Sequence, residues 1–236
     1  MSARIGLLIP SSNTSVEPEF YRALPPDVTL HTARLFLSSI SEETIAAMLA
    51  ELDSQGRLLA TADVDVIMLG AVSPGFLKGA TYDRELAARI AAATGKRAST
   101  TATALLEALR HLKVTRIAIG APYDKVVSEI ASRFLQGNGI EVVATQELGL
   151  TQNLEVGRLL PQSAYDMGLK LDCQQAEAIV FAGTNWSTMA ITQQLEAKIG
   201  KPVISTTAAA LWSALRMLGW RGSLAAQGRL LSAISE

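Results

Sequence analysis

Two short apolar runs in this chain each end in a glycine followed by small or hydroxyl-bearing residues. The first is DVIMLGAVSPG at positions 65–75, and the second is AIVFAGTNWST at positions 178–188. An apolar run of this length that ends in a turn signal is typical of a buried strand feeding a loop. Open parallel sheets bind their ligands just beyond the carboxyl ends of such strands. We therefore expect the active site to lie between these two loops.

The two loops supply hydroxyl groups, which belong to Ser73, Thr184 and Ser187. A hydroxyl is a weak nucleophile and a weak proton donor at neutral pH unless a base activates it. Neither His31 nor His111 lies in a strand-end loop, so no histidine stands beside these hydroxyls in the sequence. We take Ser73 and Thr184 as the candidate catalytic residues.

Two carboxylates, one lysine and one thiol are the other reactive groups that we consider. By position, Asp124 and Glu17 are more plausible bases than the histidines, although Glu17 also suits the first turn of a helix, where an acid favours the helix dipole. Lys78 is either a partner for a substrate carboxylate or a solvated loop lysine. Cys173 is expected in the helix before the strand at 178–181, at the end of the sheet far from the loop. A buried thiol in such a place is usually inert.

Composition limits the class of protein. The chain has 236 residues, of which 49% are hydrophobic, and a formal net charge of −1. A net charge this close to zero gives no positive electrostatic field that could bind a phosphate backbone, so we exclude nucleic acid as a partner. No apolar run approaches the roughly 18 residues of a membrane helix, and the segment 4–9 is too short and wrongly flanked for a signal peptide. We expect a soluble cytoplasmic protein, and its single cysteine excludes an internal disulfide framework and a cysteine metal cluster.

Apolar runs alternate with helical patterns along the whole chain, which predicts an α/β fold with parallel sheets. The tail at 222–236 is expected to be a last helix that packs on the first half. The predicted strands lie at 5–9, 28–35, 64–69, 96–99, 116–122, 140–145 and 178–181. The predicted helices lie at 15–23, 41–60, 84–93, 101–112, 125–136 and 164–174.

The second half of the chain repeats the pattern of the first. The segment 116–122, RIAIGAP, has the shape of 4–10, RIGLLIP, and the segment 95–110 matches 200–216 with one inserted residue. In this alignment Gly70 pairs with Gly183. The repetition predicts two pseudo-symmetric Rossmann-like lobes with parallel sheets and a ligand cleft between them. The N-terminal lobe would comprise 1–112 plus 217–236, and the C-terminal lobe 113–216.

Several motifs give this sequence its resemblance to a known family. They are IPSSNT at 9–14, the dipeptide Pro122-Tyr123, NLEVGR at 153–158 and STTA at 205–208. With them, nearly the whole chain resembles the aspartate/glutamate racemase superfamily, in its maleate isomerase and arylmalonate decarboxylase branch. The resemblance implies that Asn13, Tyr123 and Asn153 hold the carboxylates of a small diacid, since amide N–H and phenol O–H groups donate without adding charge. The other substrate-binding positions that we expect are Ser12, Gly70, Ala71, Val72, Gly183, Thr184 and Asn185.

The chain departs from this family in its thiols. Racemases and isomerases that it resembles carry two cysteines, one at the head of each loop, where one thiolate attacks or deprotonates the substrate and the other donates a proton. Arylmalonate decarboxylases keep only the second. Here both positions fall at or within one residue of Gly70 and Gly183, and Cys173 cannot substitute for them.

Each expected site residue also has a structural explanation. Asn13 suits a helix N-cap, Tyr123 could pack on its loop, and Asn153 stands in a sequence typical of a turn. Trp186 is large for a turn and would either wall the pocket or cover a subunit interface. Trp212, at apolar spacing on a helix, is expected in the core.

Two functional hypotheses follow from the family motifs and the missing thiols. The first is an enzyme that isomerises, decarboxylates or otherwise cleaves a small carboxylic acid through an enediolate or carbanion stabilised by neutral donors. The second is a catalytically silent member that binds a carboxylate metabolite. A lyase or hydrolase with new chemistry on the same scaffold is a further alternative that the sequence does not separate from the first hypothesis. We expect no metal and no organic cofactor, since no ligand cluster or phosphate-binding glycine motif is present. The resemblance implies a homo-oligomer.

Overall fold

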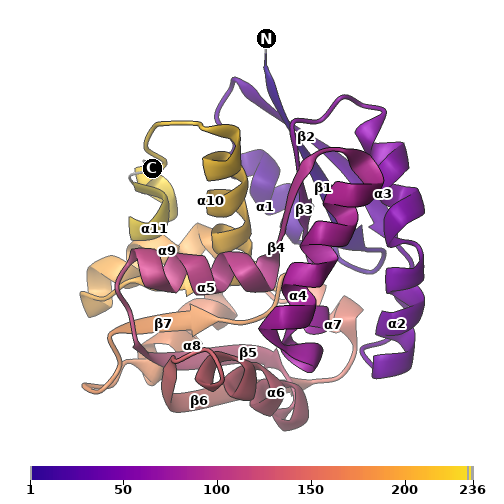
Figure 1. The fold of residues 1–236 in the computed structure, drawn as a ribbon. Helices are drawn as coiled ribbons and strands as arrows, with labels where there is room; N and C mark the ends of the chain where they lie inside the picture. Colours follow the sequence, from indigo (N-terminus) through magenta and orange to yellow (C-terminus); the bar gives the residue numbers. More distant parts are fainter. Residues whose placement is uncertain (1, 233, 235–236) are drawn as a thin grey trace.

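Two parallel four-stranded sheets form the frame of the protein in the computed structural model, which describes residues 2–232 and 234 (Figure 1). All pairings between the named strands are parallel. The first sheet has the order β2-β1-β3-β4 and contains β1 (Ala3–Pro10), β2 (Val28–Leu35), β3 (Val66–Leu69) and β4 (Arg97–Thr100). The second has the order β6-β5-β7-β8 and contains β5 (Arg116–Tyr123), β6 (Glu141–Leu150), β7 (Ala178–Phe181) and β8 (Val203–Ser205).

The two sheets have the same topology, which confirms the predicted α/β class with two Rossmann-like lobes. In each sheet the first strand of the lobe pairs with the second on one side and with the third on the other. All four residues of β3 and all four of β7 are buried, because each of these strands lies inside its sheet with helices over it. Equivalent strand ends therefore carry the two loops that the sequence singled out.

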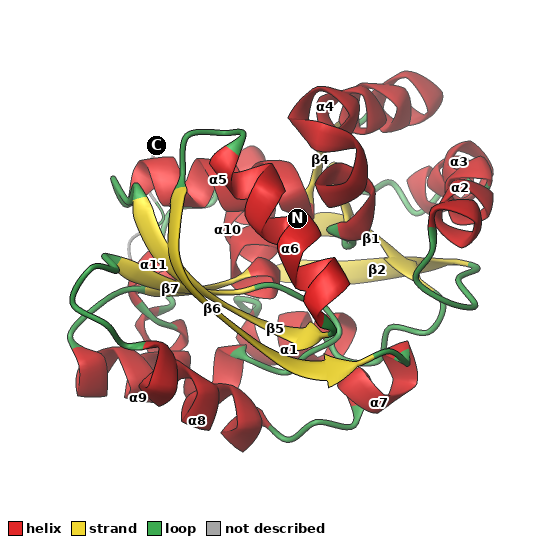
Figure 2. Cartoon of the chain, turned by 90° about the horizontal axis from the view of Figure 1, so that it is seen from below, coloured by secondary structure: helices red, strands yellow, loops and turns green. Residues whose placement is uncertain are grey.

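Helices connect the strands and cover the sheets (Figure 2). The segment 41–60, predicted as one helix, is two helices that meet at Glu51. The helix predicted at 84–93 begins earlier, at Ser73, and is kinked at Gly79, whose φ is 88°. The helices are α1 (Val16–Ala23), α2 (Glu42–Ala50), α3 (Leu52–Ala60), α4 (Ser73–Thr94), α5 (Thr101–His111), α6 (Lys125–Gln136), α7 (Asn153–Gly157), α8 (Pro161–Leu171), α9 (Met189–Ile199), α10 (Thr206–Leu218) and α11 (Arg229–Ser232), with a short 3-10 turn, η1 (Ala225–Gln227).

The equivalent helices α5 and α10 pack against each other and join the two lobes (Figure 1). Small side chains such as Ala104, Ala108, Ala210 and Ala214 are fully buried on them, which allows a close approach of the helices. The apolar core that contains these helices also includes residues from β1 and β5. The lobes therefore share one continuous core, which fixes their relative orientation and the geometry of any site between them.

The tail does not pack as the sequence predicted. It forms η1 and α11 rather than one long helix, and its packing partners are α9, α10 and β8. The backbone N–H of Arg229 donates to Glu196 Oε2 at 2.8 Å, which ties the tail to α9. The predicted N-terminal lobe also includes residues 1, 233, 235 and 236, which lie outside the described residues. None of the helices described here combines the length and the apolar character needed to cross a bilayer.

Candidate active site between the lobes

A cavity of about 270 Å³ lies between the lobes, where both strand-end loops reach it. Ala71, Val72 and Ser73 line it after β3, and Gly183 and Thr184 line it after β7. The remaining lining residues come from the first lobe (Pro10, Asn13, Leu37, Ile40, Ser41, Glu42, Phe76 and Leu77) and from the second (Ala121, Tyr123, Val126, Val127, Ile130, Ala131, Asn153 and Ala182). The cavity is thus built jointly by the two halves of the chain.

One polar part of the cavity wall is the pair of Asn13 and Thr184. The side chain of Asn13 is 1% exposed, and its Nδ2 donates to Thr184 Oγ1 at 3.1 Å. Its Oδ1 accepts from the backbone N–H groups of Ser15 and Val16 at 3.1 and 3.0 Å. Asn13 therefore stabilises the start of α1 and lines the cavity at the same time. The Thr184 hydroxyl donates in turn to the Gly70 carbonyl at 3.3 Å, so no base activates it.

A second polar part is a relay of three side chains. The hydroxyl of Tyr123 donates to Asn153 Oδ1 at 2.8 Å, and Asn153 Nδ2 donates to Ser12 Oγ at 2.8 Å. Burial raises the pKa of Tyr123 well above its ordinary value, so the phenol stays neutral. Neutral amide and phenol groups can turn toward a carboxylate and donate to it. Ser12 supports this relay but does not line the cavity.

Some backbone N–H groups of the two loops donate hydrogen bonds within the protein, and others have no acceptor there. Gly70 N–H donates to the Leu8 carbonyl at 2.7 Å, and Gly183 N–H donates to Thr206 Oγ1 at 3.2 Å. The amides of these two expected substrate-binding glycines are therefore not available for an anion, and Gly70 does not line the cavity. The N–H groups that follow them, those of Ala71, Val72 and Thr184, have no acceptor among the described residues, and such free amides suit a developing oxyanion.

Ser73 is the candidate catalytic residue with a free hydroxyl. It is the first residue of α4, lines the cavity and makes no hydrogen bond to another described residue through its side chain. The proposed bases lie elsewhere: Asp124 caps α6 by accepting from Val127 N–H at 3.1 Å, and Glu17 pairs with Arg34 at 2.8 Å. His31 and His111 are not among the cavity-lining residues either.

The largest part of the cavity wall is apolar, and the sequence reasoning missed it. Along α6, Val126, Val127, Ile130 and Ala131 repeat at the spacing that places side chains on one helix face. Further apolar lining residues are Phe76 and Leu77 of α4 and Leu37 and Ile40 of the segment after β2. The available signal was that α6 begins two residues after Tyr123, so one face of this helix must adjoin the same cleft.

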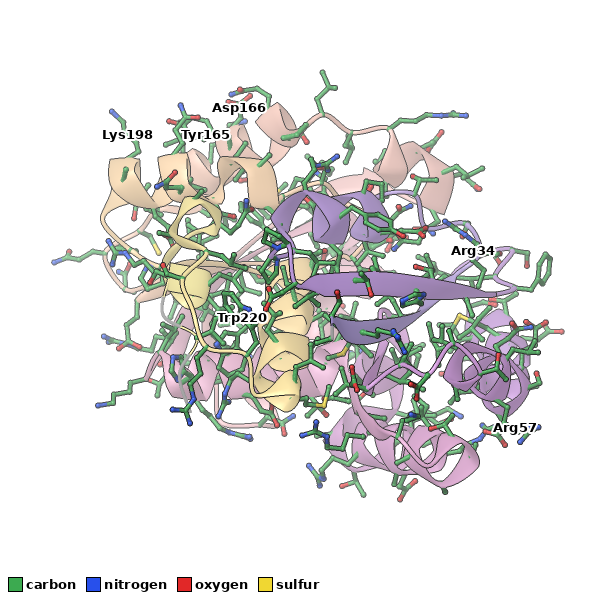
Figure 3. All side chains as sticks on the ribbon, turned by 90° about the horizontal axis from the view of Figure 1, so that it is seen from above. Arg34, Arg57, Tyr165, Asp166, Lys198 and Trp220 are labelled. Carbon is green, nitrogen blue, oxygen red and sulfur yellow. The ribbon has the colours of Figure 1, made fainter. Side chains whose placement is uncertain are left out.

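The cavity carries little charge. Among the described residues that line it, none is Lys, Arg or His, and Glu42, an exposed residue at the start of α2, is the one carboxylate. Charged side chains such as Arg57, Asp166 and Lys198 lie at the periphery of the molecule (Figure 3). Lys78 is exposed beside the ring of Tyr82, with 4.8 Å from Nζ to the ring centroid, and does not line the cavity.

Two expected site residues have other roles. Asn185 does not line the cavity, since its Oδ1 accepts from Thr14 N–H at 2.7 Å and its Nδ2 donates to the Asn153 carbonyl at 2.6 Å. Trp186 neither walls the cavity nor covers a surface: it is 0% exposed, packs edge-on against Phe181, and donates from Nε1 to Ser163 Oγ. The side chain of Asn185 therefore bridges the two lobes outside the cavity lining, and that of Trp186 turns into the body of the second lobe.

The thiol of Cys173 is remote from the cavity. Cys173 follows α8, is partly buried, and packs at the edge of the second lobe's core. Its carbonyl accepts from Lys201 Nζ at 2.6 Å. Since Cys173 is the only cysteine in the sequence, the cavity is lined without a thiol.

Comparison with known proteins assigns the chain to a family. The family model described as arylmalonate decarboxylase matches residues 5–231. The chain belongs to the arylmalonate decarboxylase family. It is 31% identical over 242 residues to the maleate isomerase of Pseudomonas putida, with 97% of each chain covered. The predicted superfamily branch is thereby confirmed, and this family contains both an isomerase and a lyase.

Solved structures of this family superpose closely on the chain. A Pseudomonas putida maleate isomerase variant with maleate has a TM-score of 0.93 at 27% identity, with 100% of both chains covered. A Nocardia farcinica maleate cis-trans isomerase mutant with a covalently bound succinylcysteine intermediate has a TM-score of 0.91 at 27% identity, covering 98% of this chain and 99% of that one. The chain therefore has the fold of an enzyme family that acts on small carboxylic acids.

Proposed function

We propose that this protein decarboxylates a small malonate-type acid that carries an apolar substituent, and that it does so without a thiol. The composition of the cavity wall supports this proposal most strongly. Neutral donors and free backbone amides lie there beside a wide apolar wall, and no cysteine lines it. The substrate would bind between the two loops with one carboxylate on the donors and its substituent against α6.

The donors suit a retained carboxylate. In the free protein Tyr123 donates to Asn153 and Asn13 donates to Thr184. The side chains of Asn13, Tyr123 and Asn153 can each donate to an anion instead. No cation lines the described part of the cavity, so a dicarboxylate such as maleate would keep its second charge without a partner. A second carboxylate placed against an apolar wall is destabilised by the loss of water, and this favours its departure as carbon dioxide.

Decarboxylation demands less of the protein than isomerisation does. The bond between the α-carbon and the departing carboxylate breaks, carbon dioxide leaves, and the electron pair passes into the retained carboxylate as an enediolate. The N–H groups of Ala71, Val72 and Thr184, which have no acceptor among the described residues, would stabilise that charge. Isomerisation through a cysteine adduct, as in the Nocardia farcinica relative, would need a nucleophile that this cavity does not carry.

The enediolate must finally accept a proton on carbon. Ser73 is the donor that we assign, because its hydroxyl lines the cavity and has no competing acceptor among the described residues. Thr184 would orient Asn13 and the substrate instead, since its hydroxyl already bridges Asn13 and Gly70. The Ser73 oxygen would recover its proton from water at the cavity mouth.

A second candidate function is binding without turnover. It is favoured by the hydrogen bonds of Thr184, which include no carboxylate or imidazole, and by the Ser73 side chain, which makes no hydrogen bond to a base among the described residues. In that case the protein would be a carboxylate sensor or a partner subunit.

A panel of acids distinguishes the two functions. Phenylmalonate, butylmalonate, malonate, maleate and aspartate would be tested for binding by calorimetry and for carbon dioxide release or isomerisation by NMR. Turnover of a substituted malonate that is lost in Ser73→Ala, with binding kept, supports the proposal. Tight binding of the same acid without turnover supports the silent binder, and binding of none of them overturns both.

A further inference from the structure

We propose that Glu19 is a positioning residue that holds the loop at 183–188 in place beside the cavity. Glu19 lies on α1 of the first lobe, is 2% exposed and does not line the cavity. Its Oε1 accepts three hydrogen bonds from the second lobe, from Ser187 Oγ at 3.1 Å, Thr188 N–H at 2.7 Å and Met189 N–H at 2.8 Å. One oxygen atom of the first lobe thus holds the end of the loop that carries Gly183 and Thr184.

The start of α9 depends on this remote carboxylate. The first N–H groups of a helix have no partner within it, and a side chain at the N-cap usually accepts from them. The N-caps Thr100 of α5, Asp124 of α6 and Ser205 of α10 do so with their own side chains. The N-cap of α9, Thr188, makes no such bond. Glu19 takes its place, so α9 and the loop before it are held correctly only while the lobes stay together.

Further contacts between the lobes lead from Glu19 to the cavity. Ser15 Oγ donates to the Asn185 carbonyl at 2.8 Å, and Thr14 N–H donates to Asn185 Oδ1 at 2.7 Å. Next along both loops comes the Asn13–Thr184 bond, at the cavity. The loop is therefore fixed at its cavity end by Asn13 and at its helix end by Glu19. Loss of the hydrogen bonds to Glu19 would allow Thr184 to move away from a bound acid.

Glu196 offers a matched control for the burial of a carboxylate. It is 5% exposed and also accepts from two backbone N–H groups, those of Val203 at 2.9 Å and Arg229 at 2.8 Å. Neither Glu196 nor its donors line the cavity. A general loss of stability should therefore follow from changes at both carboxylates, whereas a loss of loop position should follow only from changes at Glu19.

The test compares Glu19→Ala, Glu19→Gln and Glu196→Gln in the full chain. Hydrogen exchange followed by mass spectrometry would measure amide protection in the segment 183–190 without any ligand. Calorimetry with phenylmalonate would measure affinity, and thermal unfolding would measure stability. The affinity measurement rests on the proposed function, whereas the hydrogen-exchange measurement does not. If the unchanged protein binds no acid, the proposed function fails while exchange still decides the role of Glu19.

Glu19→Ala should remove protection at Thr188 and Met189 and weaken phenylmalonate binding by at least about tenfold, the scale of losing a hydrogen bond to a charged group. Glu19→Gln keeps one acceptor oxygen and should lie between Ala and the unchanged protein. Glu196→Gln should lower the melting temperature without changing affinity or protection at 183–190.

If Glu19→Ala does not fold, Ser187→Ala serves as the milder variant, since it removes one of the three donors. It should raise exchange in the same segment by a smaller amount. The role proposed for Glu19 would be overturned if the folded Glu19 variants kept the amide protection and the affinity of the unchanged protein. It would also be overturned if Glu196→Gln lowered both by the same amount.

Discussion

The amide nitrogen of Asn13 donates to the hydroxyl oxygen of Thr184 across 3.1 Å, although the two residues are 171 positions apart. This bond joins the first loop of one lobe to the third loop of the other at the wall of the cavity. It exists because the two lobes present the carboxyl ends of their sheets to each other. The length of this bond therefore depends directly on the alignment of the lobes.

Replacing Asn13 by Ala should weaken binding of the acid by about 1–3 kcal/mol, the cost of leaving buried polar groups without a partner. Because Asn13 also accepts from Ser15 and Val16 N–H, the variant should lose stability as well. Tyr123→Phe should weaken binding by a similar amount with a smaller loss of stability. Calorimetric titration together with thermal unfolding would separate the two effects, and unchanged affinity in both variants would remove these residues from the site.

The glycine at 183 should resist replacement. Its φ is 152°, and a Cβ there would lie 3.0 Å from Cγ of Pro122. Gly183→Ala should therefore destabilise the protein by about 1–3 kcal/mol, the cost of a strained backbone position. Gly139→Ala is the control, since its φ is 82° but a Cβ would meet nothing within 4 Å. Denaturant unfolding should show the larger loss at Gly183, and equal losses would mean that packing against Pro122 adds nothing.

Restoring a thiol at Gly70 should also require movement of neighbours. A Cβ at Gly70 would lie 2.9 Å from Cγ2 of Ile9 and 3.0 Å from Cδ1 of Leu7. We expect Gly70→Cys alone to fold less stably than Gly70→Cys combined with Ile9→Leu, because the unbranched Cβ of leucine removes the Cγ2 methyl group that a Cβ at position 70 would meet. Thermal unfolding of the single and double variants checks this, and a single variant as stable as the parent chain would contradict it.

Cys173→Ser should leave turnover and acid binding unchanged, because Cys173 does not line the cavity. Treatment with iodoacetamide should likewise leave activity intact while the protein stays folded. Mass spectrometry would confirm that the thiol has reacted. Loss of turnover in folded, alkylated protein would show that the thiol reaches the substrate.

The contribution of Asp83 to stability should fall as the pH rises above the ordinary pKa of an aspartate and through the raised pKa of Asp83 in the folded protein. Burial raises the pKa of Asp83, although hydrogen bonds from Thr100 and Thr103 oppose the shift. The folded state therefore keeps a proton that the unfolded state has already lost, and stability is lost as pH rises through the folded pKa. Asp83→Asn should make the free energy of unfolding less dependent on pH in this range. Denaturant unfolding between pH 4 and pH 8 would measure it, and parallel profiles for the two proteins would contradict the assignment.

Local patterns in the sequence were enough to predict the architecture. Strand length, turn residues and the repeat of 95–110 at 200–216 predicted two parallel sheets and the two strand-end loops, and the structure has both. The resemblance to the family also predicted Tyr123 and Asn153 beside one cleft, and both line it. The strands and turns could be predicted because they depend on neighbouring residues, whose periodicity and turn preferences can be read directly from the chain.

Only the tertiary structure decided which side chains face the cavity and which face the core. Trp186 follows a buried strand, as Thr184 does, yet it packs on Phe181 inside the second lobe. Glu19 lies in the first turn of α1, where the sequence gives it no special role, yet it accepts from the start of α9. Contacts between residues about 170 positions apart depend on how the lobes pack through α5 and α10, and no local pattern records that packing.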